Sequence, residues 1–329
     1  MDLQKLNNLR VLITGGMGFI GSNLCRALIE LGAKVTVLDA SLPEQGANKF
    51  NFKGIEDKIE FVQGDVRDEE LIEKTVQGKN FIFDLAAQAN YLKSSEEPLL
   101  DLDINCKSKL ILLEACRKHN KEVKIVFTSS RMVYGKIESI PVTERHPTNP
   151  LSLYGIHKLT AEKYFINYFQ NFGIRSSVIR IPNPYGPRQQ VKHSSYGIVG
   201  WFVRLALDNE TIKVFGDGSQ IRDYLYIDDL VDAMLVVAVS DKTDGKVYNV
   251  GSGRKTGFKE MADTIVDVAG SGKVELTKWP DDYEKNETGD YVADISKLQK
   301  DTGWETKVSF KDGAEKTVEF YKKNKQHYW

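Results

Sequence analysis

Short apolar runs alternate with longer segments of helical period up to about residue 180. The runs are rich in β-branched or aromatic residues and are bounded by Gly, Asp or Pro, which is typical of buried strands. The predicted strands span residues 11–14, 35–39, 59–65, 81–87, 124–130 and 176–182. The segments between them predict helices near 19–31, 69–77, 100–119 and 152–172.

Strands that are apolar on both faces and separated by helices predict a parallel sheet of doubly wound, Rossmann type. After residue 181 the alternation breaks into loops, with one further helix expected over 196–208. A strand at 247–251 is expected to return to the sheet. We therefore predict an α/β fold with a Rossmann domain over 1–180, to which 222–251 returns, and a smaller mixed α/β C-terminal domain over 181–329.

Composition limits the classes of partner. The chain has 329 residues, of which 45 are Lys or Arg and 46 are Asp or Glu, for a formal charge of -1. This balance gives no reason to expect nucleic acid or an anionic membrane as partner. Cys25, Cys106 and Cys116 form no CxxC pair and fall in predicted helices, which favours reduced core thiols. No run approaches the ~18 apolar residues of a membrane span, and no metal-ligand set is predicted. We expect a soluble, cytoplasmic protein.

A glycine loop follows the first predicted strand. In "ITGGMGFIGSNL", Gly15, Gly18 and Gly21 lie between that strand and a helix whose first turn holds Phe19 and Ile20. Backbone N–H groups and the positive end of the helix dipole can there face a pyrophosphate, which side chains would block. The pattern predicts a dinucleotide-binding loop, against the alternative of a glycine turn without a ligand.

The second predicted strand ends in Asp39, 18 residues after Gly21. A carboxylate at this place can accept hydrogen bonds from both ribose hydroxyls of the dinucleotide. It would repel a 2′-phosphate. Asp39 therefore favours NAD over NADP as the cofactor.

Hydroxyl groups end the strand at 124–130. Thr128, Ser129 and Ser130 are expected at the carboxyl end of the sheet, where ligands of this fold bind. In "YGIHK", Tyr154 and Lys158 lie four residues apart on one helix face. An ammonium group and an oxidised nicotinamide both favour the phenolate, so we expect the pKa of Tyr154 to fall from roughly 10 toward neutrality. Such a tyrosine can take a proton from a sugar hydroxyl while hydride leaves the same carbon, with Ser130 sharing the hydrogen bond.

Two other features receive simpler interpretations. Tyr321 and Lys325 repeat the spacing of four in the basic tail, without a nucleotide loop or a strand of serines before them, and we attribute this to chance. His157 lies between Tyr154 and Lys158 in sequence but on another helical face. We expect it at the surface.

Six motifs occur in the order and spacing typical of one family: "TGGMGFIG", "LAAQA", "SSRMVYG", "YGIHK", "NPYGPRQ" and "GDGSQIRDYLYIDDLVDAM". Over nearly its whole length the chain resembles the extended short-chain dehydrogenase/reductases, the family of nucleotide-sugar epimerases and dehydratases. The resemblance implies an N-terminal NAD-binding domain, a C-terminal domain that binds a nucleotide-diphosphate sugar, and a homodimer formed by pairing the helices near 100–119 and 152–172.

The resemblance also implies roles for single residues. Ser130, Tyr154 and Lys158 would be catalytic, and the last two would also contact NAD. Asn183 and Arg222 would contact the substrate's diphosphate. The remaining cofactor contacts would come from Gly15, Gly18, Phe19, Ile20, Gly21 and Asp39 in the first two strand ends, from Asp65 and Val66 at the adenine, and from Leu85, Ala86, Ala87 and Gln88 on the nicotinamide side.

Departures from the family pattern narrow the reaction. In the 4,6-dehydratases the two positions after the strand-end hydroxyl are Asp and Glu, whereas this chain has Arg131 and Met132. Neither can replace a carboxylic acid in proton transfer, which favours 4-epimerisation. A nucleotide-sugar oxidoreductase, such as a 4-keto-sugar reductase or 4-dehydrogenase, is the alternative, followed by a dehydratase and a non-catalytic NAD-binding protein. Glu287 stands where members that bind UDP-sugars usually have an arginine, so the nucleotide base stays open.

Arg131 has two interpretations. Its guanidinium suits a hydrogen bond to a substituent of the hexose, such as a carboxylate. The alternative is a structural ion pair with an acid such as Glu144.

Overall fold

The computed structural model describes residues 2–90, 92–279 and 288–329. At its centre lies a seven-stranded sheet in the order β11-β6-β5-β4-β1-β2-β3, and all neighbouring strands are parallel. Its strands are β1 (Arg10–Thr14), β2 (Lys34–Asp39), β3 (Ile59–Gln63), β4 (Phe81–Asp84), β5 (Lys124–Ser130), β6 (Arg175–Ile181) and β11 (Lys246–Asn249).

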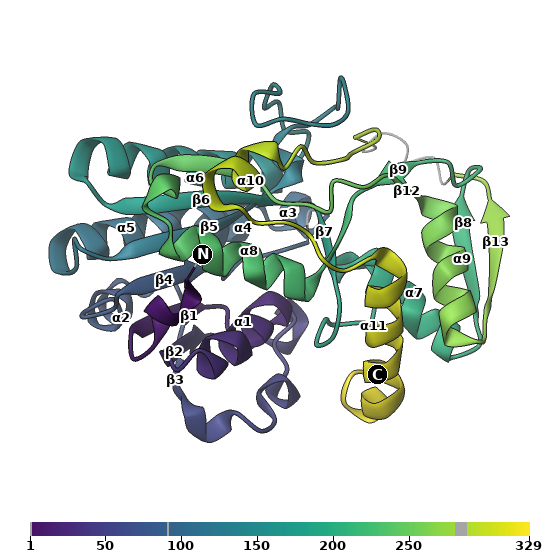
Figure 1. The fold of residues 1–329 in the computed structure, drawn as a ribbon, viewed down its shortest axis with the longest axis horizontal. Coiled ribbons are helices and arrows are strands. Elements are labelled where there is room, and N and C mark those ends of the chain that lie inside the picture. Colours follow the sequence, from purple (N-terminus) through teal and green to yellow (C-terminus); the bar gives the residue numbers. More distant parts are fainter. Residues whose placement is uncertain (1, 91, 280–287) are drawn as a thin grey trace.

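Helices cover both faces of the sheet (Figure 1). One face packs against α1 (Phe19–Glu30) and α8 (Ile227–Val239). The other packs against α2 (Glu69–Thr75), α5 (Ser108–His119) and α6 (Leu153–Phe172). The predicted Rossmann-type α/β fold is confirmed.

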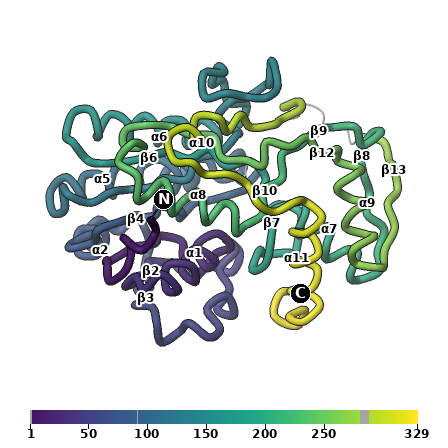
Figure 2. The backbone as a smooth tube through the Cα atoms, viewed as in Figure 1, coloured from purple at the N-terminus to yellow at the C-terminus, as the bar shows by residue number. Residues whose placement is uncertain are grey.

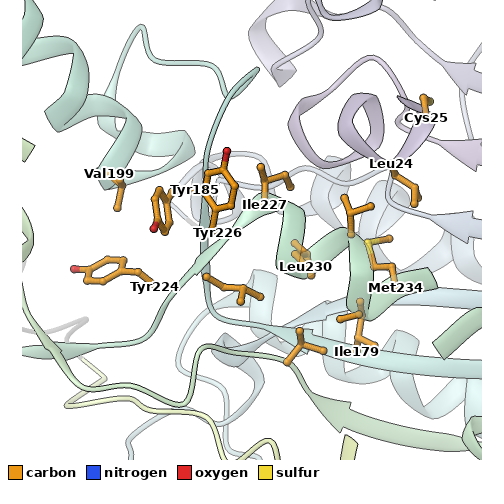
Figure 3. Packing of buried hydrophobic residues seen from close by; sticks show 14 of the residues in the cluster. Leu24, Cys25, Ile179, Tyr185, Val199, Tyr224, Tyr226, Ile227, Leu230 and Met234 are labelled. Carbon is orange, nitrogen blue, oxygen red and sulfur yellow. The ribbon is translucent and has the colours of Figure 1, made fainter. Parts of the chain in front are cut away.

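The uninterrupted apolar runs reflect burial on both faces. Because successive side chains of a strand point to opposite faces, Leu12 joins the core under α5 and α6, whereas Val11 and Ile13 join the core under α1 and α8. Figure 3 shows this second core, where Leu24 of α1 lies near Met234 of α8. A polar side chain on either face of β1 would disrupt the core on that face.

The helix predicted over 100–119 is composite. It comprises α4 (Pro98–Leu102), a π-helical turn (Asp103–Lys107) and α5, and is preceded by α3 (Lys93–Glu96). The proline stands at the first helical position, where its missing N–H does no harm.

The helix predicted over 152–172 is α6 (Leu153–Phe172). It begins after Ser152, whose hydroxyl accepts a hydrogen bond from the Gly155 N–H at 3.2 Å. It ends at Gly173 with φ of 72°, a left-handed conformation that glycine adopts without strain.

After β6 the chain forms a second group of elements around α7, α9 and α11 (Figures 1 and 2). Three two-stranded pairs accompany them, β10 with β7, β12 with β9 and β13 with β8. Residues 183–185 form a strand where a loop was expected. The elements of this group are β7 (Asn183–Tyr185), α7 (Ile198–Leu207), β8 (Thr211–Phe215), β9 (Ile221–Arg222), β10 (Tyr224–Tyr226), β12 (Thr256–Gly257), α9 (Phe258–Ala269), β13 (Lys273–Thr277) and α11 (Phe310–Asn324). α10 (Ser296–Thr302) instead lies against β11 of the central sheet.

The chain returns to the first region after this excursion. α8 lies against the sheet, and β11 pairs with β6. The division into domains over 1–180 and 181–329 stays a prediction.

Two smaller observations bear on the sequence analysis. Cys25, Cys106 and Cys116 are buried and unpaired, as expected for core thiols. Among the helices of the described residues, none has the length and apolar character needed to cross a membrane.

Candidate active site

A cleft of about 850 Å³ opens at the carboxyl ends of the sheet strands and extends to the second group of elements. The loops that follow the strands meet there, and in doubly wound sheets the crevice outside the carboxyl ends of the strands is where ligands bind. Two predicted site residues, Gln88 and Lys158, do not line the cleft; they are buried beneath it, with 1% and 2% of their surface exposed. The predicted site residues that line the cleft are Gly15, Gly18, Phe19, Ile20, Gly21, Asp39, Asp65, Val66, Leu85, Ala86, Ala87, Ser130, Arg131, Tyr154, Asn183 and Arg222.

The glycine loop packs tightly on its inner side and is open on the cleft side. A Cβ on Gly21 would lie 2.4 Å from the Gly15 carbonyl oxygen, and one on Gly15 would lie 2.9 Å from the Ala86 backbone. At Gly18, which caps α1 without a side-chain hydrogen bond, a Cβ would meet only the Gly15 oxygen within 4 Å, at 3.4 Å. A side chain at Gly18 would therefore fill cleft space at a helix N-terminus, which fits a bound pyrophosphate.

Asp39 ends β2 at the cleft with its carboxylate held by backbone groups. Its two oxygens accept hydrogen bonds from the N–H groups of Met17 at 2.9 Å and Ser41 at 2.8 Å. Burial raises the pKa of Asp39, and these two hydrogen bonds oppose the rise. Each oxygen keeps further acceptor capacity, so the carboxylate fits the ribose contact predicted for it.

Asp65 lies at the adenine end predicted from the sequence. The Arg67 guanidinium donates to both of its carboxylate oxygens, at 2.9 and 2.7 Å, and lowers the pKa of Asp65. Arg67 thus fixes the orientation of the Asp65 carboxylate and favours its ionised form at the cleft.

The segment after β4 forms the wall predicted to face the nicotinamide. The Thr14 hydroxyl accepts hydrogen bonds from the N–H groups of Leu85 and Ala86, both at 3.1 Å. Gln88 anchors the far end of the segment, because its backbone carbonyl oxygen accepts a hydrogen bond from the Asn105 side-chain amide at 2.9 Å. Gln88 thus supports the wall from behind.

Ser130, Tyr154 and Lys158 come together where β5 meets α6. Ser130 and Tyr154 both line the cleft, and the neighbouring Ser130 hydroxyl favours a lower pKa for Tyr154. Lys158 Nζ lies 5.9 Å from the centroid of the Tyr154 ring and donates to the Thr128 carbonyl oxygen at 3.0 Å. The helical spacing of four therefore places the ammonium behind the phenol.

The expected fall in the Tyr154 pKa is not found in this structure. Burial raises the pKa of Tyr154 to about 12; the Ser130 hydrogen bond opposes the rise and the charge of Asp101 adds to it. Burial, followed by repulsion from Lys109, lowers the pKa of Lys158 to about 7. Desolvation of the charged form has the largest effect on both groups. The expectation also invoked the charge of an oxidised nicotinamide, so it stays a prediction for the protein with NAD bound.

His157 is also not where we expected it. It is 9% exposed, and its Nδ1 lies 2.5 Å from a carboxylate oxygen of Asp101, which is fully buried. The face of α6 that carries His157 packs against α4 instead of facing water. The helical period separated this face from that of Tyr154 but gave no sign of the neighbouring helix.

The end of the cleft predicted to bind the substrate, lined by Arg131, Asn183 and Arg222, contains two guanidinium groups. Arg222 donates to the carbonyl oxygens of Ile221 at 2.9 Å and Gly289 at 3.2 Å. The Tyr224 phenol is buried, which raises its pKa, and both Arg222 and Arg131 oppose that rise. Two guanidinium groups in one part of a neutral protein favour an anionic ligand there.

Among the described residues, the contacts of Arg131 do not include Glu144, the acid named for the ion pair. Its guanidinium donates to the Thr288 hydroxyl at 2.9 Å and lies over the Tyr291 ring. Glu144 instead accepts a hydrogen bond from the Asn249 N–H at 2.8 Å. Glu287, whose place in the family pattern left the nucleotide base open, lies outside the described residues.

Sequence reasoning missed the buried ion pair of Lys109 with Asp84, at 3.1 Å, beneath the wall after β4. A signal was present, because Lys109 occupies a position within the apolar stretch of α5. It also missed Gln220, Phe215 and Trp279, which line the substrate end of the cleft. Phe215 ends β8, Gln220 lies in the turn that follows, and Trp279 follows β13, which pairs with β8. The sequence gives no sign of that pairing, which brings Trp279 beside the other two.

The fold and the cleft together define an α/β protein built to hold a dinucleotide beside a second ligand. The family described as GDP-mannose 4,6 dehydratase matches residues 12–317. The chain belongs to the extended short-chain dehydrogenase/reductases, among the nucleotide-sugar epimerases and dehydratases.

Similar proteins fall into both groups. The UDP-glucose 4-epimerase of Mycolicibacterium smegmatis is 35% identical over 97% of this chain and 100% of its own length. The crystal structure of UDP-glucose 4-epimerase from Thermotoga maritima with UDP-glucose has a TM-score of 0.86 at 32% identity and covers 96% of this chain and 99% of its own. A dTDP-glucose 4,6-dehydratase from Streptomyces venezuelae with NAD bound has a TM-score of 0.86 at 28% identity, covering 97% and 98%.

Proposed function

We propose that this protein is an NAD-dependent nucleotide-sugar 4-epimerase. The observation that carries the proposal is the set of side chains at the end of β5. Ser130 and Tyr154 supply hydroxyl chemistry at the cleft, and the two positions after Ser130 hold Arg131 and Met132. No carboxylic acid occupies either position, so the acid and base that remove water in the dehydratases are missing there.

Binding of the cofactor is assigned to the glycine loop, Asp39 and the wall after β4. The open side of Gly18 leaves room for the pyrophosphate, and Asp39 would accept hydrogen bonds from the ribose hydroxyls. When bound, NAD accepts hydride from the sugar carbon and later returns it. Structural neighbours of this chain that hold NAD support the assignment.

The protein's own groups move the proton. Tyr154 takes the proton of the C4 hydroxyl as the carbon is oxidised and gives it back when the carbon is reduced from the other face of the ring. Ser130 hydrogen-bonds the same oxygen, and Lys158 lies behind the phenol to favour its anion. Hydride and proton both return, so the product has the mass of the substrate.

The substrate's diphosphate would lie with Asn183 and Arg222. Asn183 donates from Nδ2 to the Asp223 carbonyl oxygen at 3.0 Å, which holds the side chain at the cleft. We further propose that the protein works as a homodimer, because α4 and α6 present exposed leucine and isoleucine side chains.

A panel of UDP-, GDP-, CDP- and dTDP-hexoses, incubated with the purified protein, tests the proposal. An epimerase yields the 4-epimer with unchanged mass, without added cofactor, and returns a deuterium placed at C4 to the product. A dehydratase yields a product lighter by one water. An oxidoreductase changes the reduced nicotinamide absorbance in proportion to product. Either of the last two results would overturn the 4-epimerase assignment.

A further inference from the structure

A buried ion pair lies behind the cleft wall predicted to face the nicotinamide. Lys109 of α5 and Asp84 at the end of β4 are each 1% exposed, and Lys109 Nζ lies 3.1 Å from one Asp84 carboxylate oxygen. Removing two charges from water has a desolvation cost that mutual attraction only partly offsets. Apolar residues would fill the same space without that cost, so stability alone does not account for the pair.

The pair holds the wall from two sides. The same Asp84 oxygen accepts a hydrogen bond from the Thr14 hydroxyl at 2.7 Å, and that hydroxyl accepts from the N–H groups of Leu85 and Ala86. Lys109 donates to the Ala86 carbonyl oxygen at 2.7 Å. Both the amide and the carbonyl of Ala86 are therefore fixed through the pair.

A short path also joins the pair to Lys158. The Thr128 hydroxyl donates to the Asp84 carbonyl oxygen at 3.1 Å, and the Thr128 carbonyl accepts from Lys158 at 3.0 Å. The two charges of the pair act on Lys158 in opposite directions. After burial, repulsion by Lys109 contributes most to lowering the pKa of Lys158, whereas Asp84 raises it.

Two other acids, Asp101 of α4 and Glu162 of α6, also raise the pKa of Lys158. Asp101 lies within hydrogen-bonding distance of His157, and Glu162 accepts two hydrogen bonds from Arg180 at 2.9 and 2.7 Å. The second Asp84 oxygen, by contrast, is buried without a hydrogen-bond partner among the described residues. Of the three acids, Asp84 raises the pKa of Lys158 most.

We infer that Asp84 and Lys109 form a positioning pair, which holds the cleft wall at Leu85 and Ala86 and sets the pH range over which Lys158 carries its charge. Neither residue lines the cleft. Both act through Lys158 and the backbone. The inference deepens the proposed function, because the charge of Lys158 matters through its effect on Tyr154.

The titration of Lys158 tests the inference directly. In protein labelled with ¹³C at the lysine ε-carbons, the Lys158 signal is assigned by its loss in Lys158→Met and followed against pH by NMR. Lys109→Met should raise the Lys158 pKa by about one unit and Asp84→Asn should lower it by a similar amount. The double variant should return toward wild type. The pH limb of kcat/KM that Lys158 governs should move in the same directions.

Lys124→Met is the matched control. Lys124 is also 1% exposed and lies 2.8 Å from Asp244, at the opposite end of β5. Its loss should lower the melting temperature and leave the Lys158 titration unchanged. If Lys109→Met does not fold, comparison of Asp84→Asn with the neutral double variant still isolates the effect of Lys109.

Shifts of the same sign in Lys109→Met and Asp84→Asn, or no shift in either, would overturn the inference, since lost packing has no reason to give opposite signs. The titration needs no sugar substrate. Its failure is therefore distinct from failure of the proposed function, which the wild-type product assay reveals.

Discussion

Lys158 Nζ donates a hydrogen bond to the Thr128 carbonyl oxygen and lies 5.9 Å from the centroid of the Tyr154 ring. The ammonium is thus attached to the end of β5, and the phenol one helical turn earlier lies at the cleft. Strand and helix together fix the relative position of the two groups. Tyr154 is the member of the pair that lines the cleft, which is consistent with the catalytic role proposed for it.

Tyr154→Phe should leave folding and NAD binding nearly intact and lower kcat by about 10²–10⁴-fold, the usual contribution of a general acid–base group. Steady-state kinetics and a thermal melt measure both effects. Tyr321→Phe is a matched control from the other Tyr–Lys spacing of four, and it loses the buried hydrogen bonds to the carbonyl oxygens of Gln189 and Gly186. A Tyr154→Phe variant that keeps more than about a tenth of the wild-type rate would argue against a tyrosine base.

The choice of cofactor depends on the Asp39 carboxylate. We expect the purified protein to carry NAD(H), identified by mass spectrometry after denaturation, and to bind NADP much more weakly because Asp39 repels the 2′-phosphate. Asp39→Asn removes the charge and should narrow the difference between the two Kd values. Equal affinity of the wild type for NAD and NADP would contradict the role of Asp39.

The exposed apolar side chains of α4 and α6 predict a dimer. Leu99 is 75% exposed and Ile156 is 44% exposed, which is unusual for large apolar residues on neighbouring helices. Leu99→Glu combined with Ile156→Glu should convert a dimer to a monomer in analytical ultracentrifugation. Leu276→Glu, at a 47% exposed position on β13, is the control and should leave the mass unchanged. A wild-type protein that sediments as a monomer would refute the prediction.

The sheet and the cofactor end of the cleft were predictable because local patterns determine them. Apolar runs mark the strands, and the carboxyl ends of the strands mark the cleft, which places Gly18, Asp39 and Ser130 together. These relationships need only the order of elements along the chain and the general geometry of a doubly wound sheet.

Contacts between side chains of different elements were not predictable in the same way. Asp101 and His157 lie 56 positions apart, and Asp84 and Lys109 lie 25 apart. Helical period identifies the faces of one helix but not the neighbour that covers each face. The effect of burial on the pKa of Tyr154 was not predictable for a related reason, since the degree of burial is a property of the assembled fold.

Arg131 provides the sharpest test of the sugar that the cleft accepts. Its guanidinium donates to Thr288 and lies over Tyr291 at the substrate end, and it opposes the rise in the Tyr224 pKa together with Arg222. We hypothesise that it hydrogen-bonds a substituent of the hexose, for which a carboxylate is best suited. A structural role, holding Thr288 and Tyr291 in place, is the competing explanation.

Arg131→Met separates these roles. A substrate contact predicts a KM raised about tenfold or more, or a changed preference between neutral and acidic sugars, at an unchanged melting temperature. A structural role predicts a lower melting temperature with little change in selectivity. Thr288→Val is the control, because it removes the protein acceptor at 2.9 Å while keeping the guanidinium. If Arg131→Met matches the wild type in both stability and selectivity, Arg131 takes no part in sugar recognition.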